Sequence, residues 1–124
     1  MVPRHDPGAL LARYHPLARG PRVCLRLARR RDLKAIADLY ARQGIPVHDL
    51  WLARLASFDL VTTLVVCATA LLDGTETVLG VGAIEFVRPT VPTLIVVDEH
   101  ETEGLAELLS GALVAHATAV RSAA

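Results

Sequence analysis

The chain has 124 residues, which fits a single domain with one hydrophobic core. Apolar residues make up 52% and aromatic residues only 4%, so the core must be built from Leu, Val, Ile and Ala, and a base-stacking platform for single-stranded nucleic acid is disfavoured. No stretch approaches the ~20 apolar residues of a membrane span, and the first residues lack the apolar region of a secretory signal. We therefore expect a cytoplasmic protein with no membrane partner.

The formal net charge is zero, but the charge is unevenly distributed. Residues 1–34 carry nine basic and two acidic side chains, whereas residues 35–124 carry four basic and eleven acidic ones. Three interpretations are open. The basic segment docks on the acidic body of this chain or of a partner, it binds a phosphate-rich ligand, or it is simply solvated, as most surface charge is.

Residues 1–22 contain four prolines and show no sustained periodicity. They predict a basic, Pro-rich arm in front of a folded domain that spans residues 23–124. Within the arm, Gly8 to Tyr14 could form one or two helical turns. The prolines also disfavour a transit peptide, because they interrupt the long amphipathic helix that such a leader needs.

The first elements of the domain are a strand and a helix. Val23 to Ala28 alternates as a half-buried strand does. Asp32 can cap the helix that follows, and Gly44 and Pro46 are typical of its end. The buried face of this helix is predicted to consist of Leu33, Ile36, Ala37 and Tyr40.

A second, shorter helix is expected after Asp49, which can cap it. Its buried face would consist of Trp51, Leu52, Leu55 and Phe58. Two strands follow, Leu64 to Leu72 and Val78 to Val87. The residues between them, 73–77, begin with Asp-Gly, which indicates a hairpin, although five residues predict a looser loop than a two-residue turn.

The last part of the chain reads as a Pro-rich loop, a short strand from Thr93 to Val97, a polar turn from Asp98 to Gly104, and a helix that ends near Val120. The stripe of this helix consists of Leu105, Leu108, Leu109, Ala112, Leu113, His116 and Val120. The whole order predicts an α/β fold of the α+β type. We expect a central, mostly antiparallel sheet of about four strands with three helices.

The junction between the last strand and the last helix is a candidate anion site. A helix that begins directly after a strand presents unpaired backbone N–H groups and the positive end of its dipole. Gly104 and Ala106 are small enough for close approach of a ligand. The predicted contact residues are Val96, Val97, Thr102, Glu103, Gly104, Leu105 and Ala106. In the alternative interpretation, the acidic residues of this turn only complement the helix dipole.

Three stretches together resemble the GNAT family of acyl-CoA-dependent N-acetyltransferases. The opening from Leu25 to Ile36, Leu-Arg-Leu-Ala-Arg-Arg-Arg-Asp-Leu-Lys-Ala-Ile, is similar to a family start, and the hairpin from Val66 to Glu85 is typical of the family. The family pattern R/Q-x-x-G-x-G/A lies on Glu101 to Ala106. The resemblance covers residues 23–120, and the order of the elements carries it more than any single motif.

The resemblance implies a function. Acetyl-CoA would lie along Thr93–Val97, backbone amides within Thr102–Ala106 would hold its pyrophosphate, and the acyl group would pass to an amine. Some family members use a carboxylate on a central strand to deprotonate that amine, often through water. This role falls on Glu85, with Asp98 at a strand end as a second candidate. In the alternative interpretation, Glu85 only faces solvent.

The chain departs from the family in two respects. Glu101 stands where the family has Arg or Gln, and two like charges ~4 Å apart repel by about 1 kcal/mol in water. The acids of this region are Asp98, Glu99, Glu101, Glu103 and Glu107. Diphosphate binding would therefore need cations, which the Arg-rich arm could supply. The chain also stops after the third helix, where the family continues, so the resemblance is to a shortened, N-terminal-half-like version that a second chain would complete.

Other chemistries are weakly indicated. The sequence His100-Glu101-Thr102-Glu103-Gly104 lacks the second His of a zinc-protease motif, and we expect no metal site. Cys24 and Cys67 lie in apolar strands, where a thiol is unreactive.

Three hypotheses remain at this point: a GNAT-like acyltransferase, a degenerate non-catalytic GNAT-like domain that serves as a dimerisation or protein-interaction module, and a small nucleic-acid binder. The neutral net charge and the acidic body weigh against the third. The first two share a physical prediction. If the sheet ends at Thr93–Val97, an apolar edge is exposed, and native proteins cover or pair such edges. We therefore expect a homodimer or a partner chain on this edge, or an arm from residues 1–22 laid over it.

Overall fold

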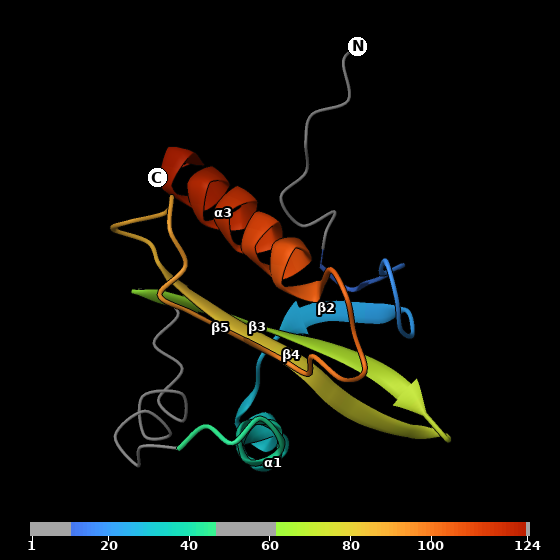
Figure 1. Cartoon of the computed structure of the whole chain (residues 1–124). Helices are drawn as coiled ribbons and strands as arrows, with labels where there is room; N and C mark the ends of the chain where they lie inside the picture. Colours follow the sequence, from blue (N-terminus) through green and yellow to red (C-terminus); the bar gives the residue numbers. More distant parts are fainter. Residues whose placement is uncertain (1–10, 47–61, 124) are drawn as a thin grey trace.

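The computed structural model describes residues 11–46 and 62–123. They form one antiparallel sheet of five strands in the order β1-β2-β3-β4-β5 (Figure 1). The strands are β1 (Arg13–His15), β2 (Val23–Leu27), β3 (Thr63–Leu72), β4 (Thr75–Glu85) and β5 (Leu94–Val97). The helices are α1 (Leu33–Arg42), which follows a 3-10 turn at Arg30–Asp32, and α3 (Leu105–Ala123). Among the described residues, no helix is both long and apolar enough to cross a membrane.

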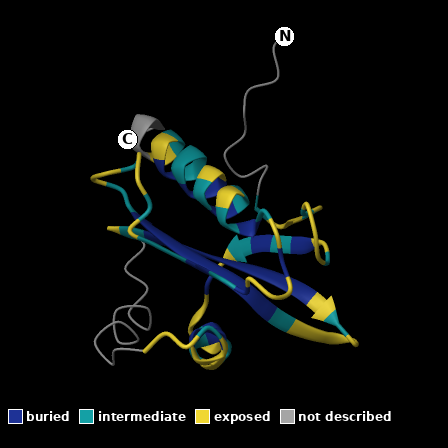
Figure 2. Cartoon of the chain, in the orientation of Figure 1, coloured by how far each residue is buried: buried dark blue, intermediate teal, exposed yellow. Residues whose placement is uncertain are grey.

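The sheet is the middle layer of three, with α3 on one face and α1 on the other (Figure 1). On the α3 side, Leu25 and Val66 pack with Leu109 and Leu113. On the α1 side, a second apolar cluster is formed by Ala28, Ile36, Leu39, Tyr40, Val65, Cys67, Val78, Val81, Ala83 and Val96. The centres of β3 and β4 are buried on both faces (Figure 2), which explains why they read as continuous apolar runs and not as alternating strands.

Two glycines in β4 let α3 approach the sheet closely. A Cβ atom on Gly80 would lie 2.9 Å from Leu105 Cδ2, and one on Gly82 would lie 2.7 Å from Leu113 Cδ1. The leucines of α3 therefore occupy the space that side chains at these positions would need. This close packing fixes α3, and with it the turn that leads from β5 into the helix.

The α+β class and the antiparallel sheet are confirmed, but the strand count is not. The sheet has five strands because Arg13–His15 pairs with β2, with Tyr14 opposite Cys24. These three residues belong to the predicted arm, and the helical turns expected there are wrong for residues 11–14. Two α-helices occur in the described part of the chain, and the third expected helix, after Asp49, lies outside it.

The hairpin between β3 and β4 is tighter than expected. Leu72 pairs with Thr75, so only Asp73 and Gly74 form the turn. Both have positive φ, 51° and 78°, as a two-residue type I′ turn requires. The predicted five-residue loop is therefore wrong. The strand also ends two residues early, at Glu85, because the Arg88 N–H donates to Glu85 O (3.0 Å) and turns the chain.

Helix α1 ends as its sequence predicts. Gly44 has φ 67°, its N–H donates to Ala41 O (3.1 Å), and the Ile45 N–H donates to Tyr40 O (2.9 Å). This is the double hydrogen bond of a Schellman C-cap, for which glycine is the preferred residue.

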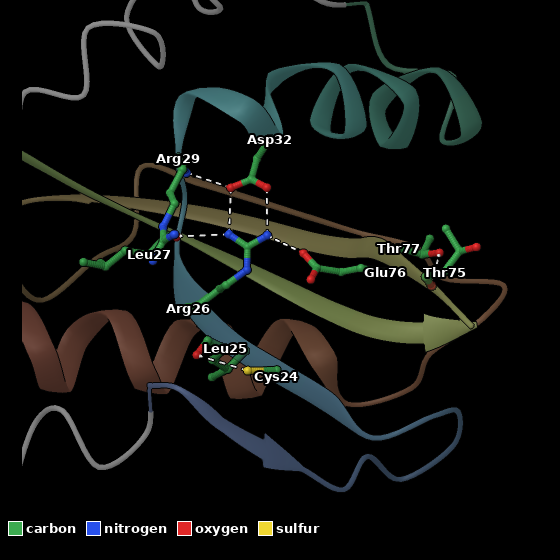
Figure 3. A network of polar contacts seen from close by, with 9 residues as sticks. All are labelled: Cys24, Leu25, Arg26, Leu27, Arg29, Asp32, Thr75, Glu76 and Thr77. Atoms are coloured by element: carbon green, nitrogen blue, oxygen red, sulfur yellow. Dashed lines mark hydrogen bonds and ion pairs between the residues drawn. The ribbon is translucent and has the colours of Figure 1, made fainter. Parts of the chain in front are cut away.

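The start of α1 is held by an ionic network and not by a simple cap. Arg26 of β2 donates from Nη1 to Asp32 Oδ2 (2.7 Å), from Nη2 to Asp32 Oδ1 (2.8 Å), and from Nη2 to Glu76 Oε1 (2.6 Å), as Figure 3 shows. The Arg29 N–H also donates to Asp32 Oδ2 (2.7 Å). Burial acts to raise the pKa of Asp32, but the hydrogen bonds from Arg26 and Arg29 outweigh it and lower this pKa overall. The network ties β2, α1 and β4 together.

Candidate functional site

The predicted anion site is the turn between β5 and α3, and Asp98 organises it. Asp98 is buried, and its N–H donates to Leu79 O (2.8 Å), which continues the pairing of β5 with β4. Its Oδ1 accepts the N–H groups of His100 (3.1 Å) and Glu101 (3.2 Å). Its Oδ2 accepts Arg42 Nε (3.2 Å) from the last turn of α1. Both carboxylate oxygens therefore hold the turn in place, which is a structural role.

Thr102 closes the same turn from the other side. Its Oγ1 donates to Asp98 O (2.6 Å), and its N–H donates to the same oxygen (3.1 Å). Thr102 is buried, unlike Glu101 and Glu103 on either side of it. Thr102 is one of the residues predicted to hold pyrophosphate, but its amide and its hydroxyl both donate to Asp98 O within the turn.

A segment of the predicted arm lies across this turn, and we call Ala18–Gly20 the strap. The Glu103 N–H donates to Arg19 O (2.8 Å), and the Ala18 N–H donates back to Glu103 O (3.1 Å). Arg19 and Glu103 form an isolated antiparallel bridge. A second amide of the predicted pyrophosphate site is therefore bonded to the chain itself.

The side chain of Arg19 strengthens the strap. Its Nη1 donates to His100 O (3.0 Å), its Nη2 to Glu99 O (3.3 Å), and its Nε lies 3.6 Å from Glu103 Oε2. Of the three interpretations of the uneven charge, docking of the basic segment on the acidic body is confirmed for Arg19. The expected cation is present, but its guanidinium is occupied by the carbonyl groups of the turn.

Glycine at position 20 allows the strap to lie directly against the backbone of Glu101 and Thr102. It has φ 112°, and a Cβ atom there would collide with the carbonyl oxygen of Glu101. Sequence reasoning missed Arg19 and Gly20 because they lie far from the turn along the chain, with Arg19 80 residues before Glu99, and in a segment without periodicity. The available signal was the Arg-Gly-Pro triplet at residues 19–21, since glycine next to proline marks a fixed turn.

The other predicted contact residues are divided between the core and the first turn of α3. Val96 is buried on the α1 side, and Val97 packs on the α3 side. Leu105 is buried in the core, and Ala106 is half-buried. Gly104 has φ 92°, which glycine adopts without strain. The amides of residues 105–107 have no acceptor within the helix, as is general for a first helical turn.

Glu85 lies at the other end of β5. It is half-buried and lines an open groove of about 700 Å³. The groove is lined by Glu85, Val87, Arg88, Pro89, Thr90, Val91, Pro92 and Thr93. Because Ala83 pairs with Leu94 and Gly80 with Val97, Glu85 and Asp98 lie at opposite ends of the β4–β5 pair. The structure does not bring the two predicted catalytic carboxylates together.

The outer side of β5 is the edge of the sheet. Val96 lies opposite Val81 in a pair that points its backbone groups at β4, and the alternation of antiparallel pairing turns those of Ile95 and Val97 outward. Residues 11–22 do not cover this edge, because they pair with β2 and with Glu103 instead. The expectation that the arm lies over β5 is thus wrong for its described part, and residues 1–10 lie outside the described residues.

In residues 11–46 and 62–123, no group of three His, Cys, Asp or Glu side chains is placed to hold a metal ion.

No protein-family model matches the chain, and no curated protein or solved structure matches it either.

Proposed function

We propose that this chain is a non-catalytic interaction module that binds its partner by accepting an additional strand on β5. One observation carries the proposal: β5 is an apolar edge strand, and its register on β4 turns the N–H and C=O groups of Ile95 and Val97 away from β4 by the alternation of antiparallel pairing. An extended partner segment that pairs there satisfies these groups, and main-chain hydrogen bonds supply its affinity.

The turn beside this edge supports an interaction role over cofactor binding. The amides of His100, Glu101, Thr102 and Glu103 all donate within the chain, to Asp98 or to Arg19. The exposed carboxylates of the turn would repel a diphosphate. A ligand that needs these amides would have to displace the strap first.

The test uses a peptide that copies residues 92–98, with added lysines for solubility, and full-length protein. We expect binding, with the amides of Ile95 and Val97 protected from hydrogen exchange when the peptide is present. Val97→Pro removes one outward N–H and should abolish binding, whereas Val97→Ala loses the same packing but keeps the N–H. Proline is tolerated on an edge whose N–H faces solvent. Equal binding by both variants would disprove strand addition.

A second candidate function is acyl transfer from acetyl-CoA, which the resemblance to N-acetyltransferases suggests. The observation that favours it is the layout of β5. The outward edge leads directly into the first turn of α3, where the amides of Leu105 and Ala106 lack helical acceptors, and Glu85 lies in a groove at the opposite end. A pantetheine arm along β5 would point its thioester toward Glu85.

Acetyl-CoA titration by calorimetry and by thermal melting separates the two functions. A ligand at 100 times its dissociation constant stabilises the folded state by ~2.7 kcal/mol, which is several degrees for a domain of this size. The interaction module predicts no heat and no shift at millimolar acetyl-CoA. A micromolar dissociation constant would overturn it in favour of the enzyme, and Glu85→Gln would then be the variant to assay.

A further inference from the structure

We propose that the strand added to β5 comes from a second copy of this chain, in a two-fold antiparallel arrangement that places Ile95 opposite Val97 of the second copy. This inference rests on the proposed function, because it names the occupant of the same edge. Four features of the molecule favour a second copy: the backbone register of β5, the two covered faces of the sheet, the contrast between the two sheet edges, and the charges that flank β5.

The register of β5 limits how a second copy can pair. The N–H of Asp98 donates to Leu79 O (2.8 Å) and sets the alternation of the strand, in which Asp98 and Val96 face inward. The Thr93 N–H also donates inward, to Ala83 O (2.9 Å), out of step with this alternation. Within the strand, Ile95 and Val97 carry the outward groups. Pairing Ile95 with Val97 of the second copy, and the reverse, is the symmetric register that satisfies every outward group of β5 at once.

The two faces of β5 set a requirement for the partner. Ile95 and Val97 contact the cluster under α3, and Leu94 and Val96 contact the cluster over α1. A strand added beside β5 continues a sheet that is apolar on both faces, so a partner that also brings a covering layer for each face buries more apolar surface than an isolated strand. A second copy does so, because a two-fold axis perpendicular to the sheet places its α3 and its α1 on the matching faces.

The opposite edge of the sheet shows how this chain closes an edge. Strand β1 has only three residues, Arg13–His15, and it is preceded by Ala12 with φ 59° and followed by Pro16. Charged side chains, prolines and an irregular backbone disfavour pairing with another chain at a sheet edge, and Arg13, Pro16 and Ala12 supply them here. Strand β5, Leu-Ile-Val-Val, carries none of them.

The charges on either side of β5 are complementary in an antiparallel pair. Arg88 is the only charged residue between Glu85 and Asp98, and it is exposed. The turn that follows β5 presents the exposed carboxylates of Glu99 and Glu101. An antiparallel arrangement brings the basic flank of each copy toward the acidic flank of the other, twice by symmetry.

Sedimentation equilibrium of the full chain over micromolar concentrations is the first test. Because the contact is a short strand pair, we expect a reversible dimer whose population rises with concentration and falls with salt. Val97→Pro should weaken it by about tenfold or more, since each copy loses an outward hydrogen bond, while Val97→Ala should dimerise more strongly than Val97→Pro. Arg88→Glu should also weaken the dimer and reduce its salt dependence.

The outcomes separate this inference from the proposed function. A monomer at all concentrations that still binds the 92–98 peptide at the β5 edge would overturn the second copy and leave strand addition intact. A dimer that Val97→Pro and Val97→Ala affect equally would also overturn it, because the contact would lie elsewhere. If the chain neither dimerises nor binds the peptide, both the inference and the proposed function fail. Circular dichroism of each variant shows that it is folded.

Discussion

Asp98 is a predicted candidate base, and in the structure it holds the turn between β5 and α3 together. It lies at the end of a strand, beside the predicted anion site, where a family resemblance suggests a base. Its carboxylate instead accepts two backbone N–H groups and the Arg42 guanidinium, and its carbonyl accepts the Thr102 hydroxyl. A sequence cannot reveal this, because the partners are set by the path of the turn and by Arg42, 56 residues away.

We expect Asp98→Ala to lower the free energy of unfolding by ~2–4 kcal/mol, because it leaves two N–H groups without their acceptor and Arg42 without its ion-pair partner. Urea denaturation measures this change. The control is Glu99→Ala, which removes an exposed carboxylate on the adjacent residue and should stay within about 0.5 kcal/mol of the parent. Equal stability of the two variants would show that Asp98 does not hold the turn.

Alanine substitutions at Gly20 and Gly44 test the role of the strap, with Gly44→Ala as the control. Both have positive φ, but only Gly20 would collide with a neighbour, whereas nothing lies within 4 Å of a Cβ on Gly44. Alanine at Gly44 should therefore cost about 1 kcal/mol from backbone strain alone. Alanine at Gly20 should cost more and should release the strap. Hydrogen exchange of the Glu103 amide reports the release directly, and unchanged protection in Gly20→Ala would contradict the role of the strap.

At the scale of elements, the sequence predicts those helices and strands whose buried residues recur at a regular spacing. Helix α1 was predicted through its apolar stripe and Gly44, and α3 through its leucines, because burial on one helical face leaves a 3.6-residue pattern. Strand β1 was missed because three exposed or half-buried residues carry no pattern. The β3–β4 turn was predicted too long, because residues 75–77 are polar and exposed or half-buried although they are paired.

The packing of α3 on β4 gives an element-scale prediction in which one substitution has opposite effects at two sites. Gly82→Ala places a Cβ 2.7 Å from Leu113 Cδ1, and we expect it to destabilise the fold by ~1–3 kcal/mol through overpacking. Gly111→Ala lies on the exposed side of α3 with nothing within 4 Å, and it should stabilise the fold by about 0.5–1 kcal/mol. Thermal melting distinguishes them. If Gly82→Ala melts at or above the parent temperature, α3 is not in contact with β4 at this position.

At the scale of the whole molecule, the α+β class and the order of β2, α1, β3, β4, β5 and α3 along the chain could be predicted, because apolar runs and helical stripes alternate along the sequence. The strap and the network of Arg26 could not, since each joins residues that only the folded sheet brings together. The anion site at the β5–α3 junction stays a prediction, and the amides of its turn donate to Asp98 or, in the case of Glu103, to Arg19 from the other end of the chain.

Because of the ionic network of Arg26, the free energy of unfolding is expected to decrease at low pH. The lowered pKa of Asp32 means that its ionised form stabilises the folded state. This contribution is complete well above the unfolded-state pKa of about 3.9, and it is lost as the pH falls through the lower folded-state value. We expect Asp32→Asn to be less stable than the parent at pH 7, with the difference shrinking below about pH 4. Denaturation midpoints across pH 2–7 test this, and a constant difference would contradict it.

The different burial of the two cysteines allows transient opening of the sheet to be measured by thiol labelling. Cys67 is fully buried at the centre of β3, and burial raises its pKa to about 12, whereas Cys24 in β2 is half-buried. The thiolate is the form that attacks thiol reagents, so Cys67 reacts only in molecules whose sheet has separated. The labelling rate of Cys67, with Cys24 as the internal reference, therefore counts rare openings in native buffer. If a second copy pairs along β5, that rate falls as the protein is concentrated.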